Sequence, residues 1–193
     1  MNRKNSNSEN QGFTTRAIHS GGGWNPTSSL TPPIVQSSTF TLKDLEEGVE
    51  MGQAIAPAEF YTRWGNPTTK QFEETMAALE GSEAALALAS GMGAISALLL
   101  SLLRSGDHLL VGRSIYSGVH ELANTIMPRF GIESSPVDPS DLEALSAAIT
   151  PDTKALIVES PTNPTLEICD LAEVAKVCRE KKVLSIIDNT FAT

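Results

Sequence analysis

Hydrophobic and polar positions alternate in short blocks over the last two thirds of the chain. Short apolar runs bounded by polar residues predict extended structure, whereas apolar residues spaced three or four apart predict helices. The extended segments are expected at 84–89, 108–111, 132–137, 155–158 and 183–187. The helices are expected at 67–80, 92–104, 117–127, 142–149 and 171–178. Strands that are apolar on both faces and alternate with helices form a parallel sheet covered on both sides, so the pattern predicts an α/β fold.

Residues at the helix ends support this pattern. Asn66 is expected to cap a helix that has Pro67 at its first position and Gly81 after its last turn. Asp138 or Ser140 is expected to cap the helix near 142. Asp170 is expected to open the helix that follows. Three apolar residues on one face of the first of these helices are expected to be buried: Phe72, Met76 and Leu79.

The most apolar run, 94–103, ends at Arg104 and is far too short to cross a membrane, so a buried helix is expected there. Before the regular alternation, residues 31–40 are expected to be extended, 42–51 to form a short surface helix and 53–59 an irregular loop. We therefore predict an N-terminal arm at 1–60 and a partial α/β domain at 61–193.

Composition narrows the function classes. The chain has 193 residues with 14 Lys and Arg against 23 Asp and Glu, a net charge of −9. This balance argues against nucleic acid or an anionic membrane surface as a partner, because both would be repelled. The two cysteines are too few for a disulfide framework, and no apolar signal-peptide core follows the N-terminus, so a cytoplasmic location is expected. The three histidines share no ligand spacing, so no metal site is expected.

Candidate chemistry follows the strands, because ligands of open parallel sheets bind beyond the carboxyl ends of the strands. Four polar loops are expected there, at 90–93, 112–116, 159–164 and 188–190. Gly91-Met92-Gly93 opens a helix whose first N–H groups could hold a phosphate, or is simply a tight turn. The dinucleotide fingerprint would need glycine where Ser96 stands, so nucleotide binding is the weaker alternative.

Asp188 follows a buried strand, so its carboxylate needs a partner: a protonated ring nitrogen, a metal, or the cap of the next segment. Tyr116 either stacks on a planar ligand or packs half-buried, and Asn163 either offers a rigid amide or is a turn residue. Arg63, with Tyr61 and a tryptophan as neighbours, either binds phosphate or stacks on Trp64.

Several long motifs, in order, resemble one enzyme family. They are Thr15-Arg-Ala-Ile-His-Ser-Gly21, Tyr61-Thr-Arg-Trp-Gly-Asn-Pro-Thr68, Leu79-Glu-Gly-Ser-Glu-Ala-Ala-Leu-Ala-Leu-Ala-Ser-Gly-Met-Gly-Ala94, Glu159-Ser-Pro-Thr-Asn-Pro164 and Ile187-Asp-Asn-Thr-Phe191. This set is similar to the Cys/Met-metabolism enzymes that use pyridoxal phosphate, which include cystathionine γ-synthase, cystathionine γ- and β-lyases and methionine γ-lyase. The resemblance runs from about Thr15 to the last residue and implies a fold-type I (aspartate aminotransferase-like) fold.

The resemblance implies pyridoxal 5′-phosphate as cofactor and a sulfur amino acid as substrate, handled by γ-elimination or γ-replacement in a homo-oligomer whose sites form across a dimer interface. It implies that Gly91 and Met92 bind the phosphate, Tyr116 stacks on the ring, Asp188 pairs with the ring nitrogen and Asn163 lies near the 3′ oxygen. Tyr61 and Arg63 would reach the phosphate of a neighbouring subunit, with Tyr61 also near the substrate. The implied catalytic residues are Tyr116 and Tyr61. The implied cofactor contacts are Tyr61, Arg63, Gly91, Met92, Tyr116, Asn163, Asp188 and Thr190.

The chain departs from the family pattern in two ways. The family's Schiff-base lysine lies some twenty residues beyond the Asp-Asn-Thr segment, and none of the lysines present stands in a matching context. A non-catalytic fragment or interaction module is therefore the alternative function. Methionine γ-lyases typically have cysteine two residues after the stacking tyrosine, where this chain has Gly118, which lowers that particular expectation.

Overall fold

The structure is a computed structural model that describes residues 11–25 and 27–192. The chain divides into two compact units, at 1–87 and 88–193, and each is described here by itself. Residues 1–10 of the expected N-terminal arm lie outside the described part. The expected division at residue 60 stays a prediction.

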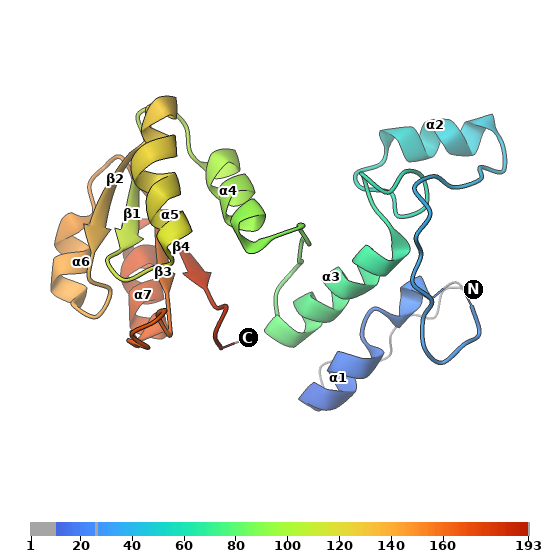
Figure 1. The fold of residues 1–193 in the computed structure, drawn as a ribbon, viewed down its shortest axis with the longest axis horizontal. Coiled ribbons are helices and arrows are strands. Elements are labelled where there is room, and N and C mark those ends of the chain that lie inside the picture. Colours follow the sequence, from blue (N-terminus) through green and yellow to red (C-terminus); the bar gives the residue numbers. More distant parts are fainter. Residues whose placement is uncertain (1–10, 26, 193) are drawn as a thin grey trace. The chain divides into compact units, whose positions relative to one another are not determined.

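The C-terminal unit is built on a four-stranded parallel sheet (Figure 1). Its strands are β1 (His108–Gly112), β2 (Glu133–Val137), β3 (Thr153–Glu159) and β4 (Leu184–Asp188). Their order is β2-β1-β3-β4, and each neighbouring pair is parallel. The α/β expectation is confirmed, as are four of the five expected extended segments.

Helices cover both faces of this sheet. They are α4 (Gly91–Leu102), α5 (Ser117–Glu121), α6 (Leu142–Ala148) and α7 (Leu171–Lys181). Side chains of β3 alternate between two apolar clusters: Ala155 and Ile157 join residues of α4 and α5, whereas Leu156 and Val158 join residues of α6 and α7. Strand β3 is therefore buried on both faces, as its continuous apolar sequence predicts.

Strand β4 is less buried than its sequence predicts. Leu184 is 48% exposed, and no residue of β4 is fully buried. Strand β4 lies at one end of the described strand order, and among the described residues only β3 pairs with it. Its position at the end of the described sheet, which the apolar run does not reveal, accounts for this exposure.

The strand expected at 84–89 is wrong. These residues have no strand assignment and pair with no strand of the described sheet. Alanine, which supplies four of the six residues, is a poor strand former, so without a pairing partner nothing holds the segment in a ladder.

The helix expected at 94–103 is present, but it is buried only in part. Helix α4 buries Leu99, and Leu103 directly after it is buried too, whereas Leu98, Leu100 and Leu102 are each about two-fifths exposed. Residues four apart lie on one side of a helix, so α4 packs in this unit along a single stripe. Because this helix is apolar on all sides, its sequence does not show which side is buried.

Two further details of the helices differ from expectation. The helix expected to stop at Pro128 changes form instead: α5 continues as the π-helix η3 (Leu122–Ile126) and the 3-10 helix η4 (Met127–Phe130). A proline is tolerated in the first turn of the 3-10 segment. The cap of α6 is Asp141, whose carboxylate accepts the N–H of Ala144, and not Asp138 or Ser140.

The N-terminal unit contains α1 (Phe13–His19), η2 (Gly22–Trp24), α2 (Leu45–Gln53) and α3 (Pro67–Glu80). The expected ends of α3 are confirmed, because the Asn66 side chain accepts the N–H of Thr68 and Gly81 has a φ of 63°. Helix α3 does not bury Phe72, which is 56% exposed, and Met76 and Leu79 are only half-buried. It buries Glu73 instead, because that carboxylate accepts the N–H of Ala87 and pairs with Lys70.

Candidate functional site

The candidate site begins at the carboxyl edge of the parallel sheet. Tyr116 lies beyond the end of β1, while Glu159 and Asp188 are the last residues of β3 and β4. Glu159 and Asp188 are partners in the strand register, and the N–H of Ser160 donates to the carbonyl oxygen of Asp188 at 3.4 Å. The expected convergence of the loops after β1, β3 and β4 is therefore observed.

Tyr116 is held through its backbone. Its N–H donates to Oε2 of Glu159 at 2.7 Å, and its carbonyl oxygen accepts the N–H of Val119 at 2.9 Å. Its side chain is 46% exposed, so one part of the ring surface is open to a ligand. An anchored backbone with an accessible ring is the arrangement that stacking on a planar molecule requires.

The start of α4 lies next to this tyrosine. A Cβ added to Gly118 would come 2.7 Å from Cε1 of Tyr116 and 3.0 Å from Sδ of Met92, so both side chains meet at the glycine. The Ser90 hydroxyl accepts the N–H of Gly93 at 3.0 Å. The N–H groups of Gly91 and Met92 have no intrahelical acceptor at a helix start, so they are available to an anion.

Asp188 uses one of its two carboxylate oxygens inside the chain. Its Oδ1 accepts the N–H of Thr190 at 3.1 Å and the hydroxyl of Thr190 at 2.5 Å. Its Oδ2 takes no hydrogen bond or ion pair from the residues that the structure describes. Asp188 therefore does order the segment that follows it, and it also keeps an oxygen for a cationic or N–H partner. Thr190 acts here through Asp188.

Asn163 lies on a loop that is held by hydrogen bonds among its own residues. Its N–H donates to Oε1 of Glu159 at 3.0 Å, and its side chain is exposed. Within the same loop the Thr162 hydroxyl accepts the N–H of Glu167, and the Ser160 hydroxyl accepts the N–H of Cys169. These bonds fix the backbone around Asn163, so its amide is presented from a rigid turn.

Sequence reasoning missed Glu159 as a site residue. It is only 5% exposed, and its two carboxylate oxygens accept from two different loops. The signal that could have found it is an acid directly after a buried strand, the same signal that singled out Asp188. Its partners lie 43 residues before it and four after it, and a sequence does not show such long-range pairing.

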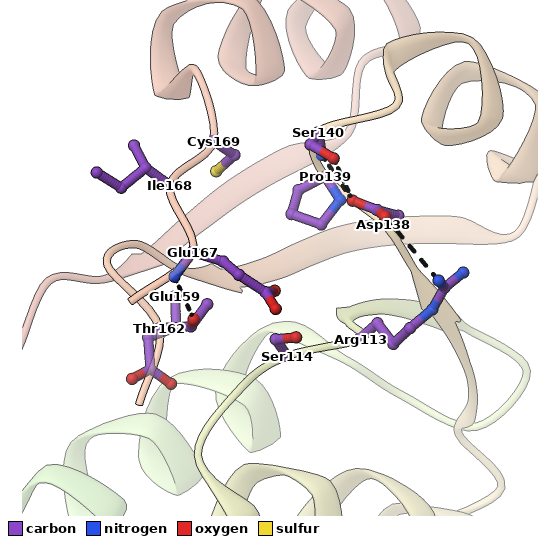
Figure 2. A pocket seen from close by; sticks show the side chains of 10 residues that line it. All are labelled: Arg113, Ser114, Asp138, Pro139, Ser140, Glu159, Thr162, Glu167, Ile168 and Cys169. Carbon is purple, nitrogen blue, oxygen red and sulfur yellow. Dashed lines mark hydrogen bonds and ion pairs between the residues drawn. The ribbon is translucent and has the colours of Figure 1, made fainter. Parts of the chain in front are cut away.

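A pocket of about 370 Å³ opens beside these loops. Arg113 and Asp138 lie on one side of it, whereas Thr162, Ile168 and Cys169 lie on the opposite side (Figure 2). Hydrogen bonds from the Ser140 hydroxyl and N–H, with a smaller contribution from Arg113, lower the pKa of Asp138. The Arg113 and Asp138 side chains are 3.9 Å apart and exposed, so this ion pair adds little stability.

Tyr61 and Arg63 belong to the N-terminal unit. Arg63 Nη2 donates to the Tyr61 hydroxyl at 2.8 Å, and the guanidinium lies 5.0 Å from the centroid of the Tyr61 ring. The alternative of an arginine stacked on Trp64 is wrong, because Trp64 stacks on Phe60 with ring centroids 5.4 Å apart. Arg63 is exposed, so its other N–H groups remain available to an anion.

The loop that carries Tyr61 and Arg63 is pinned to the segment before α2. Tyr61 forms an isolated antiparallel bridge with Thr39, and the N–H of Thr62 donates to the carbonyl oxygen of Ser38 at 2.9 Å. Gly65 allows the tight turn, because an added Cβ would come 2.7 Å from the carbonyl oxygen of Pro57. The two candidate residues therefore stand on a defined backbone.

Two features are absent from residues 11–25 and 27–192. No group of three or more His, Cys, Asp or Glu side chains there could hold a metal ion. His108, for example, bonds through its two ring nitrogens to Thr153 and Ser135 and so has a structural role. None of the helices in that part of the chain is both long and apolar enough to span a membrane.

Known proteins match nearly the whole chain. The chain is 43% identical over 185 residues to L-methionine gamma-lyase from Pseudomonas putida, covering 94% of this chain and 46% of that protein. It is 39% identical to O-succinylhomoserine sulfhydrylase from Pseudomonas aeruginosa, covering 99% of this chain and 47% of that protein. The crystal structure of cystathionine gamma-lyase from Lactobacillus plantarum complexed with L-serine matches with a TM-score of 0.83 and 40% identity, over 95% of this chain and 46% of that one.

The chain thus spans about half the length of the curated relatives it matches. The structural match also supports the expected fold-type I architecture over that half. A family profile described as Cys/Met metabolism PLP-dependent enzyme matches residues 14–193. The chain belongs to the family of Cys/Met metabolism enzymes that depend on pyridoxal phosphate.

Proposed function

We propose that this chain forms the cofactor-binding part of a carbon–sulfur lyase or γ-synthase that acts on sulfur amino acids with pyridoxal 5′-phosphate. One observation carries the proposal: an open aromatic ring, a carboxylate oxygen that takes no hydrogen bond from the described residues, and the N-terminus of α4 all lie at one edge of the sheet. Relatives named as a γ-lyase and as a sulfhydrylase support both γ-elimination and γ-replacement as reaction types.

The donors and acceptors at this edge fit the cofactor's three chemical parts. A phosphate needs several N–H donors, and the start of α4 supplies those of Gly91 and Met92. A flat pyridine ring needs an aromatic face, which Tyr116 offers. A protonated ring nitrogen needs a carboxylate, which Asp188 provides through Oδ2. Pyridoxal phosphate, when bound, withdraws electrons from the substrate's Cα and so makes its proton acidic.

The remaining candidates have supporting roles in this proposal. The Asn163 amide would donate to the 3′ oxygen of the cofactor ring. Thr190 holds Oδ1 of Asp188 by two hydrogen bonds and so orients the other oxygen. The Tyr61 hydroxyl accepts from Arg63, so its own proton is free to be donated to a substrate, and the Arg63 guanidinium is free to bind a phosphate. Tyr61 and Arg63 would serve the site of a neighbouring subunit.

Binding of pyridoxamine 5′-phosphate tests this assignment. This molecule has the ring and phosphate of the cofactor, but its amine cannot condense with lysine side chains, so only the proposed contacts hold it. We expect saturable binding by calorimetry. The Asp188→Asn variant should bind at least about tenfold more weakly, because it loses a hydrogen bond between charged groups worth roughly 1.5 kcal/mol or more.

The matched control is Asp152→Asn. Asp152 is an exposed aspartate just before β3, at the opposite edge of the sheet, so its loss should leave binding unchanged. Absence of saturable binding by the unchanged chain, or equal weakening by both substitutions, contradicts the proposal. The substrate class is then tested in a protein that joins this chain to the family's Schiff-base lysine segment, by release of an α-keto acid from L-methionine or L-cystathionine, with L-alanine as the control substrate.

A further inference from the structure

We infer that Glu159 is a positioning residue, whose buried carboxylate joins the loop that carries Tyr116 to the loop that carries Asn163 and sets both for ligand binding. The inference rests on the proposed function of the two loops, but the hydrogen bonds on which it depends are independent of that function.

The geometry of the carboxylate is specific. Oε2 accepts the N–H of Tyr116 at 2.7 Å, and Oε1 accepts the N–H of Asn163 at 3.0 Å. An ionised carboxylate has acceptors only, so it matches two N–H donors without conflict. One side chain thereby fixes two segments that come from different strands, one after β1 and one after β3.

Burial of the Glu159 carboxylate costs free energy, because the charged group is removed from water. Glu159 is 5% exposed, and none of the ion pairs in the described part of the chain includes it. A buried carboxylate usually needs a cation, and among the described residues only backbone N–H groups compensate that of Glu159. A glutamate with no cationic partner is unusual for a purely structural link, because an apolar residue would pack in this place at lower cost.

Its position adds a second consequence. Glu159 follows Ala155 and Ile157 at every second residue of β3, so it lies on the α4 and α5 side of the sheet. Asp188 is its register partner on β4. The carboxylate that fixes the two loops therefore stands directly beside the proposed partner of the ring nitrogen, and any shift of Glu159 moves all three site elements relative to one another.

The substitution Glu159→Gln tests the link most sharply. A glutamine has one acceptor oxygen and one NH₂ donor, so it can accept only one of the two N–H groups and places a donor against the other. The matched control is Glu167→Gln, because Glu167 lines the same pocket but its side chain is exposed. Both substitutions remove one negative charge, so a difference between them cannot come from net charge.

Tyrosine amides provide a direct readout. The chain has two tyrosines, so a sample labelled with ¹⁵N-tyrosine gives two backbone signals, and that of Tyr61 serves as an internal reference. In the unchanged chain we expect the Tyr116 amide to exchange with solvent at least about tenfold more slowly than a free peptide amide. In Glu159→Gln its signal should shift and its exchange should accelerate, whereas Glu167→Gln should leave it unchanged.

Affinity for pyridoxamine 5′-phosphate completes the test. We expect a loss of about tenfold in Glu159→Gln, the size of one lost hydrogen bond to a charged group, and no loss in Glu167→Gln. Glu159→Asp, which keeps the charge but is one methylene shorter, should fall between them. Circular dichroism confirms that each variant is folded.

The outcomes separate the inference from the proposed function. Fast exchange of the Tyr116 amide in the unchanged chain overturns the inference, even if the variants fail to fold. Unaltered ligand affinity in a folded Glu159→Gln also overturns it, because the link would then be structural only. Slow exchange together with no ligand binding by the unchanged chain refutes the proposed function and the positioning role with it, while the hydrogen bond itself stands.

Discussion

Replacing Gly118 by alanine should separate the stability of the chain from its ability to bind a planar ligand. The added Cβ would lie 2.7 Å from Cε1 of Tyr116 and 3.0 Å from Sδ of Met92. Contacts this short cannot persist, and of the two side chains the Tyr116 ring is 46% exposed, so it has room to turn away. The methyl group therefore moves the ring that is proposed to stack on the cofactor.

The structure gives the size and sign of both effects. Within a helix, alanine is favoured over glycine by up to about 1 kcal/mol, which offsets the cost of moving an exposed ring. The free energy of unfolding should thus change by less than about 1 kcal/mol in either direction. Holding the ring in its original place for stacking would cost about 0.5–1.5 kcal/mol of side-chain strain, so affinity for pyridoxamine 5′-phosphate should fall roughly two- to tenfold.

Calorimetric titration and urea unfolding measure the two quantities on the same samples. Ser117→Ala is the control, because Ser117 is the exposed neighbour in the same helix. The ring signals of the two tyrosines report the movement, with Tyr61 as the reference. A Gly118→Ala chain that binds as tightly as the unchanged chain, with Tyr116 ring signals in their original positions, would refute this reasoning.

Three other expectations concern stability. Glu73→Ala should lower the unfolding free energy by about 2–4 kcal/mol in urea titrations, because it leaves Lys70 without its ion-pair partner and removes the buried acceptor of the Ala87 N–H. A loss below about 1 kcal/mol would contradict this account. Asp170→Ala should cost about 1 kcal/mol by the same method, because it removes the cap of α7, and an unchanged midpoint would count against the cap. Burial raises the pKa of the Cys178 thiol, so the thiol's contribution to stability is complete below the pKa that it has in the unfolded chain and is lost as the pH rises through its higher pKa in the folded chain. Cys178→Ala should therefore flatten the decline of the unfolding free energy at alkaline pH, and an identical decline in both chains would argue against this effect.

Local signals in the sequence were sufficient for much of the fold. Asn66 and Asp170 are predicted as caps because short polar side chains directly before a helical apolar pattern commonly accept the free N–H groups of the first turn. The run 155–158 is a central strand because continuous β-branched and aliphatic residues fit a sheet that is covered on both faces.

Two of the failures have a common cause, which is that burial and strand pairing depend on partners that the local pattern does not show. Residues 84–89 are apolar but rich in alanine, and no described strand lies beside them to pair with. Phe72 lies at a helical spacing that suggests burial, yet the buried position on α3 is Glu73, because Lys70 and the N–H of Ala87 compensate its charge.

The candidate site divides in the same way. Tyr116 and Asp188 could be found because one lies in the loop after a predicted strand and the other at the end of a predicted strand. Glu159 could not be assigned a role, because its function depends on the N–H of Tyr116, whose position relative to β3 is set by the register of β1 and β3. Sequence reasoning identifies residues that carry chemistry more readily than residues that hold them in place.

The protonation state of the bound ring nitrogen tests the central claim most directly. Pyridoxamine 5′-phosphate labelled with ¹⁵N in the ring reports this state through its nitrogen chemical shift, at a pH at which the free ring is neutral. We predict that the ring nitrogen is protonated when bound to the unchanged chain and neutral when bound to Asp188→Asn. A neutral ring nitrogen in the unchanged chain, or a protonated one in both chains, would contradict the assignment of Asp188 and the site built around it.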